Sequence, residues 1–285
     1  MKFYFAFLFI VFFQNSHSQV LQILEDSIHV YYTKLQTSAT ENDRNSASNR
    51  MRELFVQSFG DPGIFEFPFE RLKLCKITSS DGRVRLINWN QPADDGSSKY
   101  YCFVLWKNLK TGELSWQELT DTQHRPDKLE DKYLNAEKWF GTLYFDIIPM
   151  GKKKRSDTYT LLGWESKDNL TTCKVMDALS ISNGNVRLGA PIFKDEKDRV
   201  RKRIIFEYSN DVSMSVKYHS KKKTIVVDHL SPRSSMMEGI YADYGPDGSY
   251  DAYQLRKGKW EFQSNIDVGT FSEEEDRPYV DPRRQ

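Results

Sequence analysis

The sequence has 285 residues, of which 41 are lysine or arginine and 40 are aspartate or glutamate. This near balance argues against nucleic-acid binders that rely on sequence-independent attraction to phosphate, because such proteins usually carry a strongly basic face. Aromatic residues make up 14% of the chain, whereas glycine and proline number only 15 and 10. The composition therefore favours ordered β-sheet over disorder, and the length suits one large β domain or two small ones.

Residues 1–18 have the pattern of a cleavable signal peptide. Lys2 provides a positive charge, Phe3 to Phe13 form an apolar run, and Ser16-His17-Ser18 is a small-x-small cleavage site. The run is shorter than the roughly 20 apolar residues that a membrane-spanning helix needs. We therefore expect cleavage after Ser18, export to the periplasm and no membrane span. The alternative is a buried N-terminal helix.

Residues 19–63 form the predicted N-terminal helical segment. Val20 to Gln36 place apolar residues close to a 3.6-residue period, and Arg50 to Phe59 resume that pattern. The polar stretch Thr37 to Ser48 separates these two parts, and Gly60-Asp61-Pro62-Gly63 ends the second. The pattern indicates two helices packed as a hairpin or one long interrupted helix.

Residues 64–120 form a predicted first β-meander, because the apolar period changes from 3.6 to 2. Its strands are expected at Leu72 to Lys76, Val84 to Trp89, Lys99 to Trp106 and Leu114 to Leu119. Residues 121–138 are the most polar interior stretch, and one helical turn or more is expected from Asp127 to Lys138. We interpret them as a polar connection and a domain boundary.

Residues 139–272 form the second, larger β-region, centred on Thr158 to Phe193. That stretch predicts three strands, joined by a polar turn at Ser166 to Asn169 and by Asn183-Gly184, a strong two-residue hairpin signal. The adjacency of Gly163 and Trp164 indicates a backbone that passes close under the indole. Further strands are expected at Arg203 to Tyr208, Ser213 to Tyr218, Thr224 to Leu230, Ile240 to Tyr244, Tyr250 to Leu255 and Lys259 to Ile266, with Gly245 to Gly248 as a turn.

The predicted fold class is mainly β with N-terminal helices (α+β). Its antiparallel meanders are expected to form a sandwich or a barrel- or propeller-like sheet arrangement. Residues 273–285 are acidic, then basic, and contain two prolines. We expect this last segment to be a mobile tail.

The three cysteines, Cys75, Cys102 and Cys173, lie inside predicted strands and show no CxxC spacing. A zinc site is therefore not expected. An odd number of cysteines allows one disulfide at most within the monomer. Two alternatives remain open, buried free thiols or a Cys75–Cys102 bridge between neighbouring strands.

Few residues have the spacing that catalysis or metal binding requires. Asp228-His229 could orient an imidazole, but the chain has no Gly-x-Ser-x-Gly motif and Ser231-Pro232 resembles an ordinary turn, so we predict a structural role. The acidic stretches Asp94 to Ser97 and Asp247 to Asp251 resemble fragments of calcium loops, yet a hairpin turn is the favoured interpretation. No catalytic residue, cofactor-binding residue, metal ligand or cofactor is predicted.

Aromatic and basic residues offer two kinds of binding surface. Trp89, Trp106, Trp164 and Trp260 could stack on sugars, although their strand register favours the core. The basic runs suit an acidic partner, although solvated hairpin tips are commoner. The candidate partner-contact residues are Lys152, Lys153, Lys154 and Arg155, and a second basic run spans Lys221 to Lys223.

Several motifs carry a resemblance to a known family. They are DGRVRLINW from Asp81, YTLLGW from Tyr159, DHLSP from Asp228 and PDGSYD from Pro246. Together they resemble a largely uncharacterised family of exported, β-rich proteins of Bacteroidetes-type bacteria. One member type of that family is similar to the periplasmic plug subunit of the type IX secretion translocon. The resemblance implies no catalytic residues.

The first functional hypothesis is a non-enzymatic periplasmic interaction protein. The resemblance implies an accessory or plug subunit that docks on a large outer-membrane protein-export barrel, and no nucleic-acid or small-molecule ligand is expected. One alternative is an exported hydrolase of envelope polymers, in which acids or His229 would converge in a pocket. Another is a carbohydrate-binding module, in which two or three tryptophan or tyrosine side chains would be coplanar and exposed.

Overall fold

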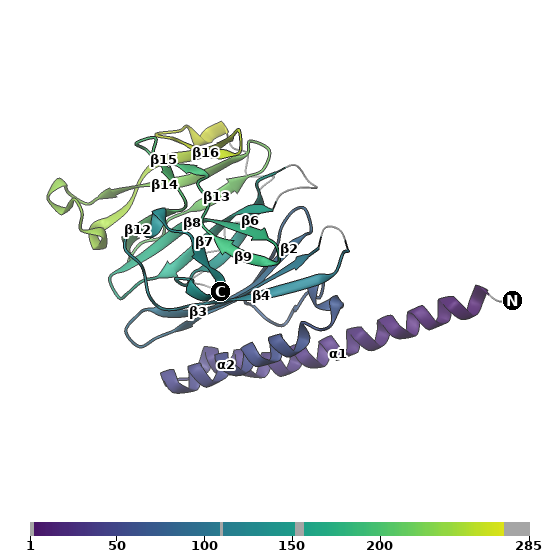
Figure 1. Ribbon diagram of the computed structural model, residues 1–285. Helices are drawn as coiled ribbons and strands as arrows, with labels where there is room; N and C mark the ends of the chain where they lie inside the picture. The colour runs from purple at the N-terminus through teal and green to yellow at the C-terminus, as the bar shows by residue number, and fades with distance from the viewer. Residues whose placement is uncertain (1–2, 109–110, 152–156, 271–285) are drawn as a thin grey trace. The chain divides into compact units, whose positions relative to one another are not determined.

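A computed structural model describes residues 3–108, 111–151 and 157–270 (Figure 1). The predicted fold class is confirmed, because the chain is mostly β-strand with two helices at its N-terminus. The chain forms two compact units. Unit 1 comprises Met1–Leu74 and Leu105–Trp116, and unit 2 comprises Cys75–Val104 and Gln117–Gln285.

Unit 1 contains helix α1 (Phe3–Thr37), helix α2 (Glu41–Ser58) and the 3-10 turn η1 (Pro62–Phe65). The predicted polar break, Thr37 to Ser48, is wrong in extent, because α2 already begins at Glu41. Thr40 is the reason: its hydroxyl accepts from the backbone N–H of Asp43 at 3.1 Å and donates to the Asp43 carboxylate at 2.6 Å. This reciprocal cap satisfies the first turn of α2.

The two helices pack as a hairpin, which decides between the two alternatives left open by the sequence. Their buried apolar side chains include Leu21, Ile28, Leu35, Met51, Leu54 and Phe55. Glu25 lies inside this apolar face. One of its carboxyl oxygens accepts from the backbone N–H of Arg71 at 2.7 Å, so that this buried polar group is hydrogen-bonded.

The first sheet is four-stranded, with β1 (Cys75–Thr78), β2 (Val84–Pro92), β3 (Ser98–Lys107) and β4 (Leu114–Thr120) in chain order. This arrangement confirms the predicted first meander. Between this sheet and the next, residues 121–138 form the 3-10 turns η2 (Leu129–Asp131) and η3 (Ala136–Lys138) around the short strand β5 (Leu134–Asn135).

The middle sheet has the order β5-β9-β8-β7-β6, and β12 (Ile204–Ser209) pairs with β8 outside that order. The three strands and two turns predicted for the central stretch are confirmed. The carboxylate of Asp168 accepts from backbone N–H groups in the first turn. In the second turn, Asn183 and Gly184 have φ values of 52° and 76°, as a type I′ turn requires. The remaining strands of this sheet are β6 (Leu143–Pro149), β7 (Thr158–Ser166), β8 (Thr171–Ser182) and β9 (Asn185–Leu188).

The third sheet has the order β11-β10-β16-β15-β14-β13 and is antiparallel except where β10 pairs with β16. Its long strands β14 and β15 pair with each other along most of their length. Its strands are β10 (Phe193–Lys194), β11 (Val200–Arg201), β13 (Val216–His219), β14 (Thr224–Pro232), β15 (Tyr244–Arg256) and β16 (Lys259–Gln263).

Three predictions for this sheet are wrong. Ile240 to Tyr244 is not a strand but contains the 3-10 turn η5 (Tyr241–Asp243), and Gly245 to Gly248 is not a turn but part of β15. The turn-forming residues are tolerated because the carboxylate of Asp247 accepts from the backbone N–H and hydroxyl of Ser249 at 2.9 and 2.7 Å. Ser231-Pro232, predicted as a turn, is likewise the end of β14.

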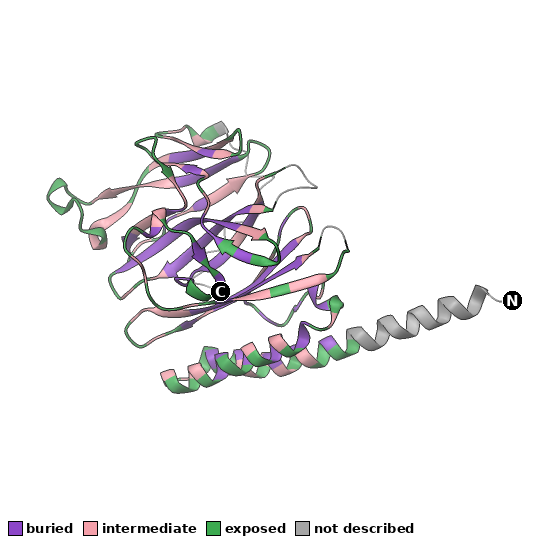
Figure 2. Cartoon of the chain, viewed as in Figure 1, coloured by how far each residue is buried: buried purple, intermediate pink, exposed green. Residues whose placement is uncertain are grey.

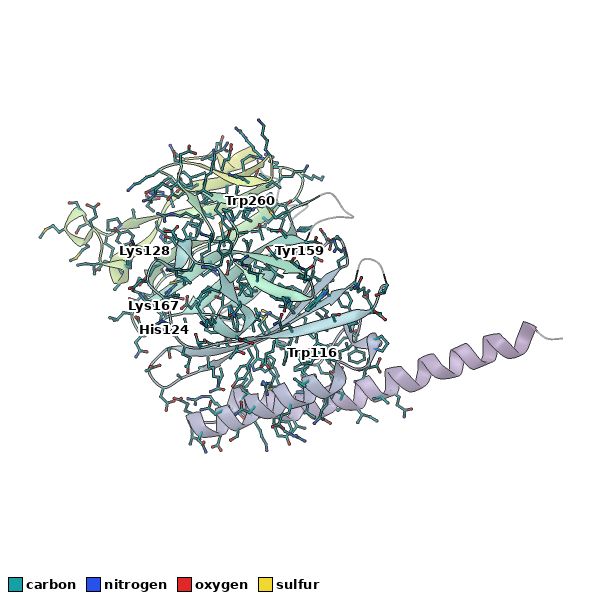
Figure 3. All side chains as sticks on the ribbon, viewed as in Figure 1. Trp116, His124, Lys128, Tyr159, Lys167 and Trp260 are labelled. Carbon is teal, nitrogen blue, oxygen red and sulfur yellow. The ribbon has the colours of Figure 1, made fainter. Side chains whose placement is uncertain are left out.

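The middle sheet is covered on both faces by the rest of unit 2. Toward the third sheet, the buried indole of Trp260 donates to the Thr160 hydroxyl at 2.7 Å. Toward the first sheet, the Tyr159 hydroxyl donates to the Asp81 carboxylate at 3.1 Å. The side-chain amide of Asn88 forms hydrogen bonds with both the backbone N–H and the carbonyl of Tyr144. Figure 3 labels Tyr159 and Trp260. This double coverage explains why β7 and β8 are buried almost continuously.

Gly163 lies where this packing is tightest. A Cβ atom there would meet the Thr142 methyl group and approach the Tyr144 ring to 3.0 Å. The aromatic ring beside Gly163 is therefore Tyr144 rather than the expected indole of Trp164. The small residue is needed because the neighbouring side chains are buried and cannot move away.

We expect Gly163→Ala to lower the free energy of unfolding by about 1–3 kcal/mol, because the added methyl group overpacks the core. Calorimetric melting would measure the loss. Gly60→Ala is the matched control, since nothing lies within 4 Å of its Cβ position and its φ is not left-handed. Equal melting temperatures for Gly163→Ala and the parent chain would contradict the tight packing.

Candidate interaction surface

The predicted partner-contact residues, Lys152, Lys153, Lys154 and Arg155, lie outside the described residues. The strands that precede and follow them, β6 and β7, are paired antiparallel. The other basic run, Lys221 to Lys223, forms the exposed turn between β13 and β14. The interpretation of that second run as a solvated hairpin tip is confirmed.

A different exposed element stands out in unit 2, at the far end of the β14–β15 pair. We call residues 229–247 the ribbon and residues 234–241 the tip. Within the ribbon, Leu230 pairs with Pro246 and Pro232 with Tyr244, and the strands continue as a two-stranded extension of the third sheet. Figure 1 shows the ribbon reaching away from the other strands of its sheet, and Figure 2 shows that its end is exposed.

The tip carries a cluster of exposed apolar side chains. Met236, Met237, Ile240 and Tyr241 are 88%, 37%, 50% and 47% exposed. Single exposed apolar residues are normal on protein surfaces, but four within six positions form a local apolar patch of the kind that marks binding sites. Of the other exposed large apolar side chains in the described ranges, Val20 and Ile23 lie three positions apart on α1, whereas those of unit 2, such as Leu170 and Val200, are separated along the chain.

The tip is ordered by its own backbone hydrogen bonds. Successive turns close from Met237 N–H to the Ser234 carbonyl at 3.0 Å, from Ile240 N–H to the Met237 carbonyl at 3.0 Å, and from Asp243 N–H to the Ile240 carbonyl at 2.9 Å. The Tyr244 hydroxyl accepts from the Gly239 N–H at 3.0 Å. Gly239 has φ +86°, a conformation that favours glycine.

The tip was not predicted from the sequence. Ile240 to Tyr244 were expected to form a strand, and no role was expected for Met236 and Met237. Positions 236, 237, 240 and 241 have helical spacing, which is typical of a buried face, so the pattern alone could not reveal their exposure.

His229 lies at the base of the ribbon, opposite the bulge that Asp247, Gly248 and Ser249 form in β15. Its Nδ1 is 2.7 Å from a carboxylate oxygen of the buried Asp251, whose other oxygen accepts from the Asn265 N–H at 3.0 Å. The hydrogen bond from Asp251 raises the pKa of His229 above its usual value, with Asp247 adding a smaller attraction. Such a pair can orient an imidazole for general base catalysis. The nearby Ser249 hydroxyl, however, donates to Asp247 at 2.7 Å.

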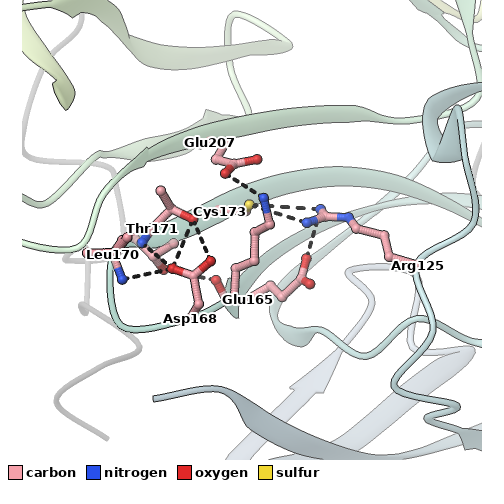
Figure 4. A network of polar contacts seen from close by, with 9 residues as sticks. Arg125, Glu165, Asp168, Leu170, Thr171, Cys173 and Glu207 are labelled. Atoms are coloured by element: carbon pink, nitrogen blue, oxygen red, sulfur yellow. Dashed lines mark hydrogen bonds and ion pairs between the residues drawn. The ribbon is translucent and has the colours of Figure 1, made fainter. Parts of the chain in front are cut away.

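A second polar cluster lies where β7, β8 and β12 meet the segment around Arg125 (Figure 4). Arg125 and Glu165 form an ion pair at 3.0 Å without hydrogen-bond alignment, and Lys167 pairs with Glu207 at 2.6 Å. Burial raises the pKa of Glu165 to about 7 despite the attraction of Arg125. The Arg125 guanidinium also contacts the Cys173 sulfur at 3.8 Å.

The three cysteines are free and buried, which confirms the free-thiol alternative and excludes the Cys75–Cys102 bridge in this structure. Burial raises the pKa of Cys75 and of Cys173 to about 12, and raises that of Cys102 well above its usual value. All three thiols therefore stay protonated near neutral pH. Because the thiolate is the nucleophile, they are chemically inert.

The other sequence candidates have structural partners. Asp95 accepts from the backbone N–H and hydroxyl of Ser97 at 2.9 and 2.6 Å, so that this acidic stretch forms a hairpin turn. Within the described residues no group of three or more histidine, cysteine or acidic side chains could hold a metal ion. The core assignment of Trp89, Trp106, Trp164 and Trp260 is confirmed, because all four are buried.

The pKa of Glu165 makes stability depend on pH. The pKa of Glu165 in the folded protein lies above its ordinary value of 4.5, so folding favours the protonated carboxyl group. The protonated form therefore stabilises the folded state fully below about pH 4.5, and this contribution is lost as pH rises through about 7. We expect Glu165→Gln to match the parent chain at pH 4.5 and to exceed its free energy of unfolding at pH 8 by roughly 3 kcal/mol. Denaturant titrations at both pH values would measure this. A difference that does not change with pH would contradict it.

The imidazole of His229 offers a second titration test. We expect Asp251→Asn to lower the pKa of His229, because the main hydrogen bond that favours the charged ring is lost. Asp247→Asn is the matched control and should shift that pKa less. NMR titration of the imidazole resonances measures both variants. A larger shift in Asp247→Asn would show that Asp251 is not the main partner.

Among residues 3–108, 111–151 and 157–270, no helix has the length and hydropathy that crossing a membrane would require. Comparisons with protein-family models, with curated proteins and with solved structures gave no match. The resemblance to an exported Bacteroidetes-type family therefore stays a prediction from sequence motifs.

Proposed function

We propose that this chain is a non-enzymatic interaction protein of the bacterial cell envelope. One observation carries the proposal: Met236, Met237, Ile240 and Tyr241 are held in water by an ordered tip. Moving such a side chain from full exposure to full burial is worth about 1.5–3 kcal/mol; these four are 37–88% exposed, so completing their burial would contribute part of that value each and anchor the tip on a partner.

The location and the partner rest on the sequence. The signal-peptide pattern of residues 1–18 supports export to the periplasm. The motif resemblance supports a role as an accessory or plug subunit on a large outer-membrane barrel of type IX secretion. A rigid β unit with an exposed apolar tip suits such a role, because docking needs a surface and not a catalytic cleft.

An exported hydrolase is the second candidate, and the His229–Asp251 pair is the observation that favours it. The same pair also has a structural use, because it ties β14 to β15 beside the bulge. The carbohydrate-binding alternative loses its main support, since the four tryptophans that would stack on sugars are buried.

A pull-down of the tagged full chain from detergent-solubilised envelope tests the proposal. We expect one large outer-membrane barrel in a stoichiometric amount, identified by mass spectrometry. An unrelated exported protein with the same tag is the control. If the chain is recovered alone, the interaction proposal fails, and hydrolase assays comparing the parent chain with His229→Ala become the next measurement.

A further inference from the structure

The tip combines apolar side chains with a negative charge, and this combination identifies the kind of partner. In the ribbon the acidic residues are Glu238, Asp243 and Asp247, against a single arginine, Arg233, and the partly exposed His229. The amide and hydroxyl of Ser249 hold the pKa of Asp247 below its usual value, so that this carboxylate is charged at neutral pH.

We infer that the tip inserts its apolar side chains into an apolar cleft on another protein, and that the rim of this cleft carries lysine or arginine. The inference rests on the proposed interaction function and adds the chemistry of the partner. Met236, the most exposed of the four apolar residues, is the expected anchor. The exposed Glu238, two positions away, would meet the basic rim.

The shape of the tip supports insertion. Three successive backbone hydrogen bonds fix the chain from Ser234 to Asp243, and the Arg233 N–H donates to the Asp243 carbonyl at 3.1 Å where the ribbon narrows into the tip. A preordered segment loses little conformational entropy on binding. The methionine side chains can still adapt to the walls of a cleft, because methionine is unbranched and flexible.

The charge argues against a membrane as the partner. Segments that bind the membrane interface combine apolar residues with lysine and arginine, which attract anionic lipids. Here Glu238 within the tip and Asp243 next to it outnumber the single Arg233, and such a surface would repel this net negative charge.

A second copy of this chain fits less well. The exposed turn Lys221 to Lys223 supplies the required positive charge. Within the described ranges, however, the exposed large apolar residues all lie outside 201–235, so that no apolar cleft wall is offered next to that turn. A different protein is therefore the expected occupant.

Site-specific photocrosslinking in the full chain tests the inference. The probe p-benzoylphenylalanine replaces Met236 in cells that contain the native envelope, and the matched control places it at Lys222, an exposed position in another turn of the same sheet. We expect one discrete protein adduct from position 236 and none from position 222. The crosslinked peptide, mapped by mass spectrometry, should contain apolar residues flanked by lysine or arginine.

Charge and apolar variants complete the test. Because losing a buried anchor costs at least about 1.4 kcal/mol, Met236→Asp should lower recovery of the partner about tenfold or more, whereas Glu238→Lys, a charge reversal at the rim, should lower it by a smaller factor. Lys222→Glu should leave recovery unchanged. Unchanged melting curves show that the variants fold, as expected for exposed positions.

The other outcomes overturn the inference in distinguishable ways. If the pull-down recovers a partner but the tip variants bind it equally well, the tip is not the anchor and the interaction function stands. A self-adduct would assign the tip to a second copy. Flotation of the parent chain, but not Met236→Asp, with phosphatidylglycerol vesicles would assign it to lipid. If no partner is recovered at all, the proposed function fails together with the inference.

Discussion

The double coverage of the middle sheet is the constraint on which unit 2 depends. Strands β7 and β8 are buried on both faces along most of their length, so nearly every side chain along them must fit a packed layer. Two polar contacts fix the layers in place, one from the Trp260 indole to Thr160 and one from Tyr159 to Asp81. Because the hydrogen-bond donors and acceptors must match as well as the shapes, the layers can meet in few registers.

Much of the fold could be predicted from local sequence. Asn183-Gly184 specifies a tight hairpin turn, and the alternating strands on either side were placed correctly because each is stabilised by its immediate neighbours. The predicted break before α2 was too long, since capping by Thr40 outweighs the polar composition that follows it. Gly245 to Gly248 was misassigned because Gly245 and Pro246 pair with β14, while Asp247 and Gly248 form part of a bulge within β15 rather than a chain-reversing turn.

The candidate site was largely beyond sequence analysis. Exposure is a property of the folded chain: in sequence Met236 resembles any core methionine, and only the structure shows that its side chain is 88% exposed. Runs of charge are visible in a sequence, and Lys152 to Arg155 were therefore the predicted partner-contact residues. Conversely, the tryptophans were correctly assigned to the core, because strand register alone indicates which face they occupy.

The buried thiols set an order of events for the maturation of this chain. Once folded, Cys75, Cys102 and Cys173 are shielded from oxidants and disulfide exchange. Before folding, the same sulfur atoms are exposed and can pair wrongly, and an odd number always leaves one available for another molecule. In an oxidising compartment, burial of the first and middle sheets must therefore outpace thiol oxidation, so that the folding rate governs the yield of native protein.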